Sequence, residues 1–137
     1  MIAGFHHLAI QCQDLARCEA FYRDVLGLPV KQRWQDPAGA ERSVWLAVDG
    51  QGSFLALERA LAAPSPRRFQ APDAGLHLVA LRIARGERAA WEARLAAAGV
   101  AIVHRTRYTL YVSDPEGNRV GLSHHPDPEP DPDSETA

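Results

Sequence analysis

The sequence predicts an α+β fold in which two βαβββ modules form a curled mixed sheet around a concave cavity. The first observation is an internal repeat, because residues 4–10 (GFHHLAI) align with residues 75–81 (GLHLVAL). The second is a segment rich in proline and alanine at 59–74, which separates the two halves. The third is the order of patterns within each half, where a strand pattern precedes a helix pattern and further strand patterns follow. We therefore expect one domain over residues 1–126, with module one at 4–58 and module two at 75–123.

Module one opens with alternating apolar and polar side chains at 5–11, which predicts a strand. Asp14 is placed to cap the start of a helix, and Gly27 is placed to end it. The apolar stripe of this helix consists of Leu15, Cys18, Phe21, Tyr22, Val25 and Leu26. Strands are predicted near 29–35, 42–48 and 53–58, the first two joined by an Asp-Pro-Ala-Gly turn.

Module two follows the same plan. A strand is predicted at 76–83, and a helix carrying Trp91 and Leu95 is predicted at about 87–98, before Gly99. Three further strands are predicted near 100–105, 107–113 and 118–123, the last two joined by an Asp-Pro-Glu-Gly-Asn turn. Residues 127–137 alternate proline with acids, so we expect this tail to be disordered.

Composition excludes several classes of protein. Of the 137 residues, 46% are hydrophobic and 23% are charged, which is typical of a globular domain. The formal net charge is -2, and the basic residues are scattered, so no nucleic-acid partner is expected. No apolar run is long enough for a membrane span, and no signal peptide is visible. Cys12 and Cys18 are predicted to be reduced, buried thiols, and the protein is expected in the cytoplasm.

Three segments carry a resemblance to a known family, namely FHHLAI at 5–10, FYRDVLGL at 21–28 and YVSDPEGNRV at 111–120. They resemble the vicinal oxygen chelate superfamily, which includes glyoxalase I, extradiol dioxygenases, methylmalonyl-CoA epimerase, fosfomycin-resistance enzymes and bleomycin-binding proteins. The resemblance covers residues 4–123 and implies a two-module fold that hosts several chemistries as well as plain binding.

The resemblance also implies four metal-ligand places, one on the first strand and one on the last strand of each module. The first of these holds His7, which is a donor. The other three correspond to Ala56, Leu78 and Gly121, none of which has a donor side chain. His77 aligns with His6 rather than with His7, and it shares a strand face with Val79 and Leu81. The sequence therefore predicts no ordinary metal site.

Strand alternation assigns side chains to the cavity. His7 faces it because Leu8 and Ile10 face the helix. By the same argument the cavity is lined by Trp45, Phe54 and Tyr111, an aromatic surface suited to a planar or apolar ligand.

The polar candidates each have two interpretations. His7 is either an acid/base or ligand-binding group, or a histidine satisfied by a neighbour. Glu58 either acts as a base or pairs with an arginine, and Tyr111 either donates to a ligand oxygen or bonds within the core. The arginines considered as ligands for an anionic group are Arg107 and Arg119, and Ser123 is a further binding candidate. His124 and His125 are expected at the surface, at the start of the tail.

Three functions are consistent with these residues. The leading one is a metal-independent binder of a small aromatic or apolar molecule, of the bleomycin-resistance kind. An alternative is a metal-free lyase, isomerase or dioxygenase of the same superfamily, in which His7 or Glu58 moves a proton and Tyr111 polarises an oxygen. The third is such an enzyme with an atypical divalent metal at His7. A homodimer is expected in each case, because open sheet edges favour pairing.

Overall fold

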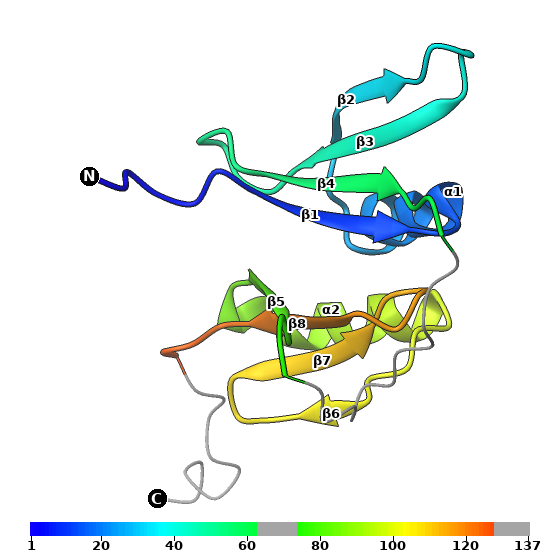
Figure 1. Ribbon diagram of the computed structural model, residues 1–137. Coiled ribbons are helices and arrows are strands. Elements are labelled where there is room, and N and C mark those ends of the chain that lie inside the picture. The colour runs from blue at the N-terminus through cyan, green and yellow to red at the C-terminus, as the bar shows by residue number, and fades with distance from the viewer. Residues whose placement is uncertain (63–73, 128–137) are drawn as a thin grey trace, which may run out of the picture. The chain divides into compact units, whose positions relative to one another are not determined.

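The structure is a computed structural model that describes residues 1–62 and 74–127 (Figure 1). The chain divides into two compact units, of which the first runs to Arg67 and the second starts at Arg68. Most of the joint predicted at 59–74, and all but the first residue of the tail predicted at 127–137, lie outside the described residues. Each unit is described by itself below.

Unit one is a four-stranded mixed sheet with one helical segment against it (Figure 1). Its elements are β1 (His7–Cys12), α1 (Leu15–Ala20), η1 (Phe21–Val25), β2 (Val30–Gln35), β3 (Glu41–Ala47) and β4 (Phe54–Arg59). The strand order is β1-β4-β3-β2, with β1 parallel to β4 and the other neighbours antiparallel. The predicted order of one strand, one helix and three strands is confirmed.

The helical segment begins and ends where the sequence predicts. The side chain of Asp14 accepts a hydrogen bond from the backbone nitrogen of Arg17 at 2.9 Å, which satisfies a free donor of the first turn. Gly27 has a φ of 78°, a conformation that glycine adopts without steric cost. The expectation of one regular helix was incomplete, because Phe21–Val25 is a π-helix. Apolar spacing alone does not distinguish this wider turn from an α-helical one.

Unit two repeats the topology of unit one. Its elements are β5 (Val79–Arg82), η2 (Arg85–Glu87), α2 (Arg88–Ala97), β6 (His104–Arg105), β7 (Thr109–Ser113) and β8 (Arg119–Ser123). The strand order β5-β8-β7-β6 again has its first strand parallel to its last. Two βαβββ modules of an α+β fold are therefore confirmed.

Two strands of unit two are shorter than predicted. The strand expected at 76–83 covers only β5, and the one expected at 100–105 covers only β6. A strand exists only where a neighbour offers backbone partners, and β5 pairs with the four residues from Val120 to Ser123. Side-chain alternation carries no information about the length of the partner strand.

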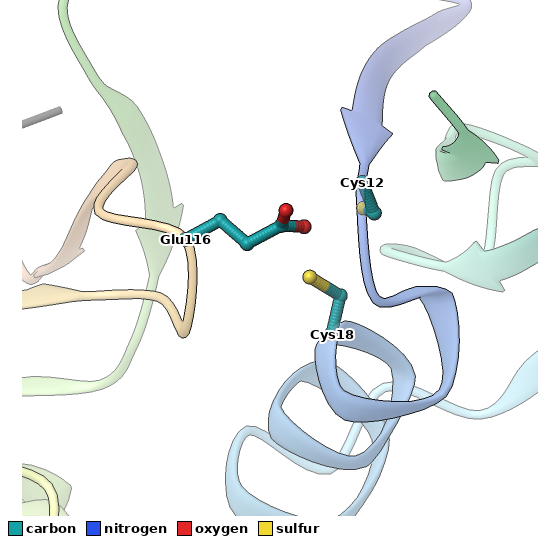
Figure 2. Close-up of side chains that lie close together, drawn as sticks. All are labelled: Cys12, Cys18 and Glu116. Carbon is teal, nitrogen blue, oxygen red and sulfur yellow. The ribbon is translucent and has the colours of Figure 1, made fainter. Parts of the chain in front are cut away.

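The core of each unit lies between its sheet and its helix. In unit one the helix-facing residues of the strands and the apolar stripe of the helix are buried, among them Ile10, Val44, Leu57, Phe21 and Tyr22. Cys12, at the end of β1, and Cys18, on α1, have no exposed surface and are not joined in a disulfide. Figure 2 draws their side chains, whose sulfur atoms lie within 4.8 Å of each other. Buried thiols are what the sequence predicted.

The Asp-Pro-x-Gly segments are turns, as predicted. The Asp36 carboxylate accepts from the backbone nitrogens of Ala38 and Ala40 between β2 and β3. The Asp114 carboxylate accepts in the same way from Glu116 and Asn118 between β7 and β8. These two turns occupy different places in their modules. The topological counterpart of Asp114 is Asp49, between β3 and β4, which caps its own loop by the same pattern.

No helix within residues 1–62 or 74–127 is long and apolar enough to cross a membrane.

Candidate functional site

The sheet of unit one has one face that its helix does not cover, and we call it the open face. Along β1, His7, Ala9 and Gln11 are exposed, whereas Ile10 and Cys12 are buried toward the helix. The register pairs His7 with Phe54, Ala9 with Ala56 and Gln11 with Glu58, so the same alternation continues on β4. On β3 the open-face residues are Ser43, Trp45 and Ala47.

A continuous line of aromatic rings crosses all four strands of the open face. The ring of His7 is stacked on Phe54, with centroids 4.8 Å apart and planes 5° apart. Phe54 is stacked in turn on Trp45 at 4.4 Å and 22°. Trp45 contacts Trp34 on β2 at 5.4 Å. We call these four residues, His7, Phe54, Trp45 and Trp34, the aromatic strip.

The aromatic strip contains one residue that the sequence analysis missed. Trp45, Phe54 and His7 were expected on one surface, and the structure brings them together. Trp34 was not considered, although it is 40% exposed and pairs with Ser43 on the open face. Alternation along β2 places Trp34 on the same face as Gln32, two residues before it. The register of the structure then shows that this is the open face, because Gln32 pairs with Trp45.

His7 has a histidine neighbour as well as a stacking partner. Its Nδ1 atom lies 2.7 Å from Nδ1 of His6, so the two imidazoles share one hydrogen bond. The ring of His6 also meets Phe54 edge-on, with centroids 5.5 Å apart. Both histidines are exposed. The pair fixes the orientation of His7, because each imidazole restrains the rotation of the other.

A cation also lies beside the aromatic strip. Lys31 on β2 places Nζ 5.1 Å from the centroid of Phe54 and donates a hydrogen bond to the carbonyl oxygen of Gly52 at 3.1 Å. The sequence analysis did not select Lys31, because strict alternation along β2 does not place it beside Phe54.

Glu58 lies at the other end of the open face from His7. His7 pairs with Phe54, and Glu58 is four residues further along β4, which corresponds to about 13 Å. At this separation, His7 and Glu58 cannot both contact the same atom of a small substrate. Glu58 is exposed and makes no ion pair with any residue in 1–62 or 74–127.

Ser43, opposite Glu58, has an unsatisfied hydroxyl group. The residue is 2% exposed, and its Oγ atom finds no hydrogen-bond partner within the described part of the chain. Buried polar groups are almost always paired, and the Ser43 hydroxyl is an exception to this rule.

In unit two the predicted residues lie on the face that includes Gly121. Tyr111 and Ala80 flank Gly121 in the sheet, and the Tyr111 ring lies 5.5 Å from that of His104. Arg119 donates to the backbone oxygen of His77 at 3.3 Å. Ser123 accepts a hydrogen bond from the Thr109 hydroxyl at 2.9 Å.

Leu78 and Gly121, which correspond to two of the metal-ligand positions implied by the resemblance, lie side by side in unit two and are apolar. A Cβ atom on Gly121 would lie 3.5 Å from Cδ1 of Leu78 and 3.2 Å from Cγ2 of Thr109. A longer side chain at position 121 would require Thr109 to move. Ala56, the corresponding place in unit one, is buried between Trp45 and Ala9. The donors needed to join His7 in a metal shell are therefore not found at these places.

Two predictions about unit two were wrong. Arg107 was expected on a strand, but it lies in the bend before β7, with its guanidinium 5.3 Å from the Tyr108 ring. Strand alternation therefore does not orient it.

His124 was expected at the surface, but it is 2% exposed. Its Nε2 atom accepts from Nη1 of Arg88 at 3.1 Å, and Nδ1 consequently donates to the carbonyl oxygen of Asp127. A polar side chain after the last strand gives no sequence signal of burial, because the partner on α2 is distant in the chain.

Unit one also holds an ion-pair network around the buried carboxylate of Glu19, which sequence reasoning missed. Glu19 on α1 is 5% exposed and accepts from Arg33 of β2 at 2.5 and 2.9 Å and from Arg23. Arg33 also pairs with Glu41 at 2.7 Å. The Arg33 hydrogen bonds, together with the positive charges of Arg33 and Arg23, hold the pKa of Glu19 below its ordinary value despite burial. This network fastens the helix to β2 and lies away from the aromatic strip.

Two βαβββ modules in one chain define a fold class that hosts several different functions. The sequence matches the model of the Glyoxalase/Bleomycin resistance protein/Dioxygenase superfamily over residues 4–122. The chain belongs to this superfamily, which confirms the resemblance seen in the sequence.

Solved structures share the fold. A glyoxalase/dioxygenase from Nostoc punctiforme has a TM-score of 0.73 at 21% identity, with 91% of this chain and 92% of that chain covered. The antibiotic-binding protein TnmS3 from Streptomyces sp. CB03234 has a TM-score of 0.64 at 23% identity, covering 90% and 96%.

The fosfomycin resistance protein FosX from Listeria monocytogenes, complexed with Mn(II) and a dihydroxypropylphosphonic acid, has a TM-score of 0.69 at 17% identity, covering 90% and 93%. Likeness at these identities establishes the fold and leaves the activity open. None of the curated proteins matches the sequence closely enough to count as a relative.

Proposed function

We propose that the protein binds a planar aromatic molecule on the open face of unit one, without a metal ion. The observation that carries this proposal is the aromatic strip, in which four rings from four different strands are in contact. Trp34 is exposed and Trp45 is half-buried, so indole surface is available to a ligand ring. Each additional aromatic contact contributes about 0.5–1.5 kcal/mol beyond the burial of apolar area.

The donor chemistry supports binding without metal. A divalent ion held by protein side chains needs three or more converging nitrogen or oxygen donors. Of the four places that relatives would use, only His7 has a donor, and its Nδ1 atom is engaged by His6. The other three places have no side-chain nitrogen or oxygen, because they hold Leu78, Gly121 and Ala56. The proposed binding therefore uses no metal ion.

The end of the open face beside Trp34 offers polar contacts to a ligand. Gln11 and Glu58 are exposed there on neighbouring strands and pair with each other in the register.

The proposal is tested by titration with 2-naphthamide, a planar uncharged probe, followed by the indole N–H signals in NMR spectra. The chain has three tryptophans, of which Trp91 lies on α2 of unit two. We expect the signals of Trp34 and Trp45 to shift while that of Trp91 does not. Trp45→Ala should weaken binding about two- to ten-fold, whereas the matched change Trp91→Ala should not alter it. Equal shifts of all three signals, or none, would contradict the proposal.

A second candidate is an enzyme that uses His7 for metal-free acid/base chemistry. The specific observation in its favour is the His6–His7 hydrogen bond, which fixes one exposed imidazole in orientation, as a proton-transfer group requires. The residues of unit two named from the sequence, Tyr111, Arg107, Arg119 and Ser123, remain proposed binding residues of their own unit. This candidate predicts turnover that His7→Ala abolishes while the circular dichroism spectrum is unchanged.

A homodimer in the cytoplasm is also proposed. Each four-stranded sheet ends in two edge strands, β1 and β2 in unit one and β5 and β6 in unit two, and exposed edges favour pairing between copies. Sedimentation velocity of the whole chain tests the dimer, and a single monomeric species would refute it.

A further inference from the structure

Lys31 owes its position to an irregularity in β2. Val30 pairs with Leu46 and Gln32 pairs with Trp45, so two steps on β2 correspond to one step on β3 and Lys31 is the extra residue. Such a bulge bends the strand and redirects a side chain, and bulges are common beside functional sites. Here the redirected side chain extends over Phe54 to the β3–β4 loop.

The ammonium group of Lys31 is held but not neutralised. One hydrogen bond goes to the Gly52 carbonyl oxygen, and the Phe54 ring lies 5.1 Å from Nζ. An ammonium group has three donors, so two remain. Within residues 1–62 and 74–127, Lys31 makes no ion pair.

The environment of the ammonium has few negative groups. Lys31 lies over Phe54 of the aromatic strip, and the rings of His7 and Phe54 have His6 beside them. The nearby loop contains Asp49, whose carboxylate accepts from the backbone nitrogens of Gln51 and Ser53 and makes no ion pair with Lys31. Glu58 lies at the far end of the open face. An unpaired cation at one end of an aromatic surface is complementary to an aromatic ring that carries an anionic group.

Lys31 is also unusual in the composition. It is the only lysine in the chain, since every other member of the 15 Lys+Arg residues is arginine. An ammonium is a compact, strongly hydrated charge on a flexible stem, whereas the planar guanidinium stacks on aromatic rings. A lysine at this place can bind an anion through its remaining donors while its ammonium group stays over the Phe54 ring.

We propose that the ligand is a planar aromatic carboxylate, with its ring on the aromatic strip and its carboxylate bonded to Lys31. This inference rests on the proposed function and adds the chemical class of the ligand and the residue that recognises it. A charge-assisted hydrogen bond of this kind corresponds to an affinity gain of about ten- to hundred-fold over the uncharged analogue.

The test compares two probes of nearly the same shape, 2-naphthoate and 2-naphthamide, titrated at pH 7.5 into wild type and three variants. Lys31→Gln removes the charge, and Lys31→Arg retains it. Arg42→Gln is the matched control, because Arg42 is an exposed cation on β3 whose position alternates away from the open face. We expect wild type to bind naphthoate at least ten-fold more tightly than naphthamide. Lys31→Gln should reduce this ratio to about one, and Lys31→Arg and Arg42→Gln should retain most of it.

The possible outcomes separate the two proposals. If naphthamide shifts Trp34 and Trp45 but naphthoate binds no better, the binding function stands and the carboxylate inference is overturned. If the naphthoate preference survives in Lys31→Gln, or falls equally in Arg42→Gln, the assignment of Lys31 is wrong. If neither probe binds wild type, both proposals fail.

A second measurement does not depend on a variant that has to fold. Acetic anhydride acetylates the amines of the protein, and Lys31 is the only side-chain amine. We expect saturating 2-naphthoate to slow acetylation of Lys31 at least ten-fold relative to the N-terminal amine, as measured by peptide mass spectrometry. Unchanged relative rates would overturn the inference.

Discussion

The buried carboxylate of Glu19 allows a quantitative test of how unit one is held together. Glu19→Gln removes the charge that Arg33 and Arg23 contact while nearly preserving side-chain shape. Hydrogen bonds to charged groups contribute about 1.5–3 kcal/mol each, but Arg33 is 43% exposed and retains Glu41, so solvent offsets part of the loss. We expect the free energy of unfolding of unit one to fall by about 2 kcal/mol at pH 7.

The pH dependence of this effect has a definite sign. The pKa of Glu19 is lower in the folded chain than its ordinary value of 4.5. The stabilisation is therefore fully present above pH 4.5 and is lost as pH falls through the lower, folded-state pKa. The difference between wild type and Glu19→Gln should consequently shrink in acid.

The assay is urea unfolding at several pH values, with Trp91→Phe as the background in every protein. The remaining fluorescence then comes from Trp34 and Trp45 of unit one. Glu41→Gln is the control, because Glu41 is 41% exposed, and we expect its effect to stay within about 0.5 kcal/mol. Equal effects of the two variants at pH 7, or a Glu19→Gln effect that does not decline in acid, would refute the reasoning.

Three further predictions concern single side chains. His124→Ala should lower the stability of unit two by about 1–3 kcal/mol, because it removes the buried hydrogen bonds that His124 makes with Arg88 and with the Asp127 carbonyl. The exposed His125 should tolerate alanine, and equal melting temperatures of the two variants would contradict this. Ser43→Ala should leave the ligand-free protein equally stable or up to about 1 kcal/mol more stable, since it removes an unsatisfied hydroxyl, and a clear loss in urea unfolding would show that Ser43 is bonded. Gly121→Glu should destabilise unit two because Thr109 Cγ2 obstructs the new side chain, and a variant that unfolds at the wild-type urea concentration would contradict the crowding seen at Gly121.

The order and topology of the elements could be predicted because they depend on local patterns. The repeat of residues 4–10 at 75–81 indicated two equivalent modules, and the Asp14 cap and Gly27 stop defined one helix. What failed depends on partners distant in the chain. The length of β5 is set by β8, and the burial of His124 is set by Arg88.

The aromatic part of the site was predictable for the same reason. Trp45 and Phe54 follow from alternation, which is a property of each strand alone. Lys31 did not follow, because a bulge shifts the alternation and its position depends on the register between β2 and β3. Alternation along β3 places Ser43 on the same face as Trp45. That its hydroxyl has no partner can be recognised only once the surrounding groups have been placed in three dimensions.

The central claim is that an aromatic surface, and no metal ion, binds the ligand. The most direct measurement is the affinity for 2-naphthamide before and after exhaustive dialysis against EDTA, followed by the indole signals of Trp34 and Trp45. The account predicts the same dissociation constant in both samples and no change when Mn²⁺ or Zn²⁺ is added. Binding that disappears after dialysis and returns with the metal ion would contradict it.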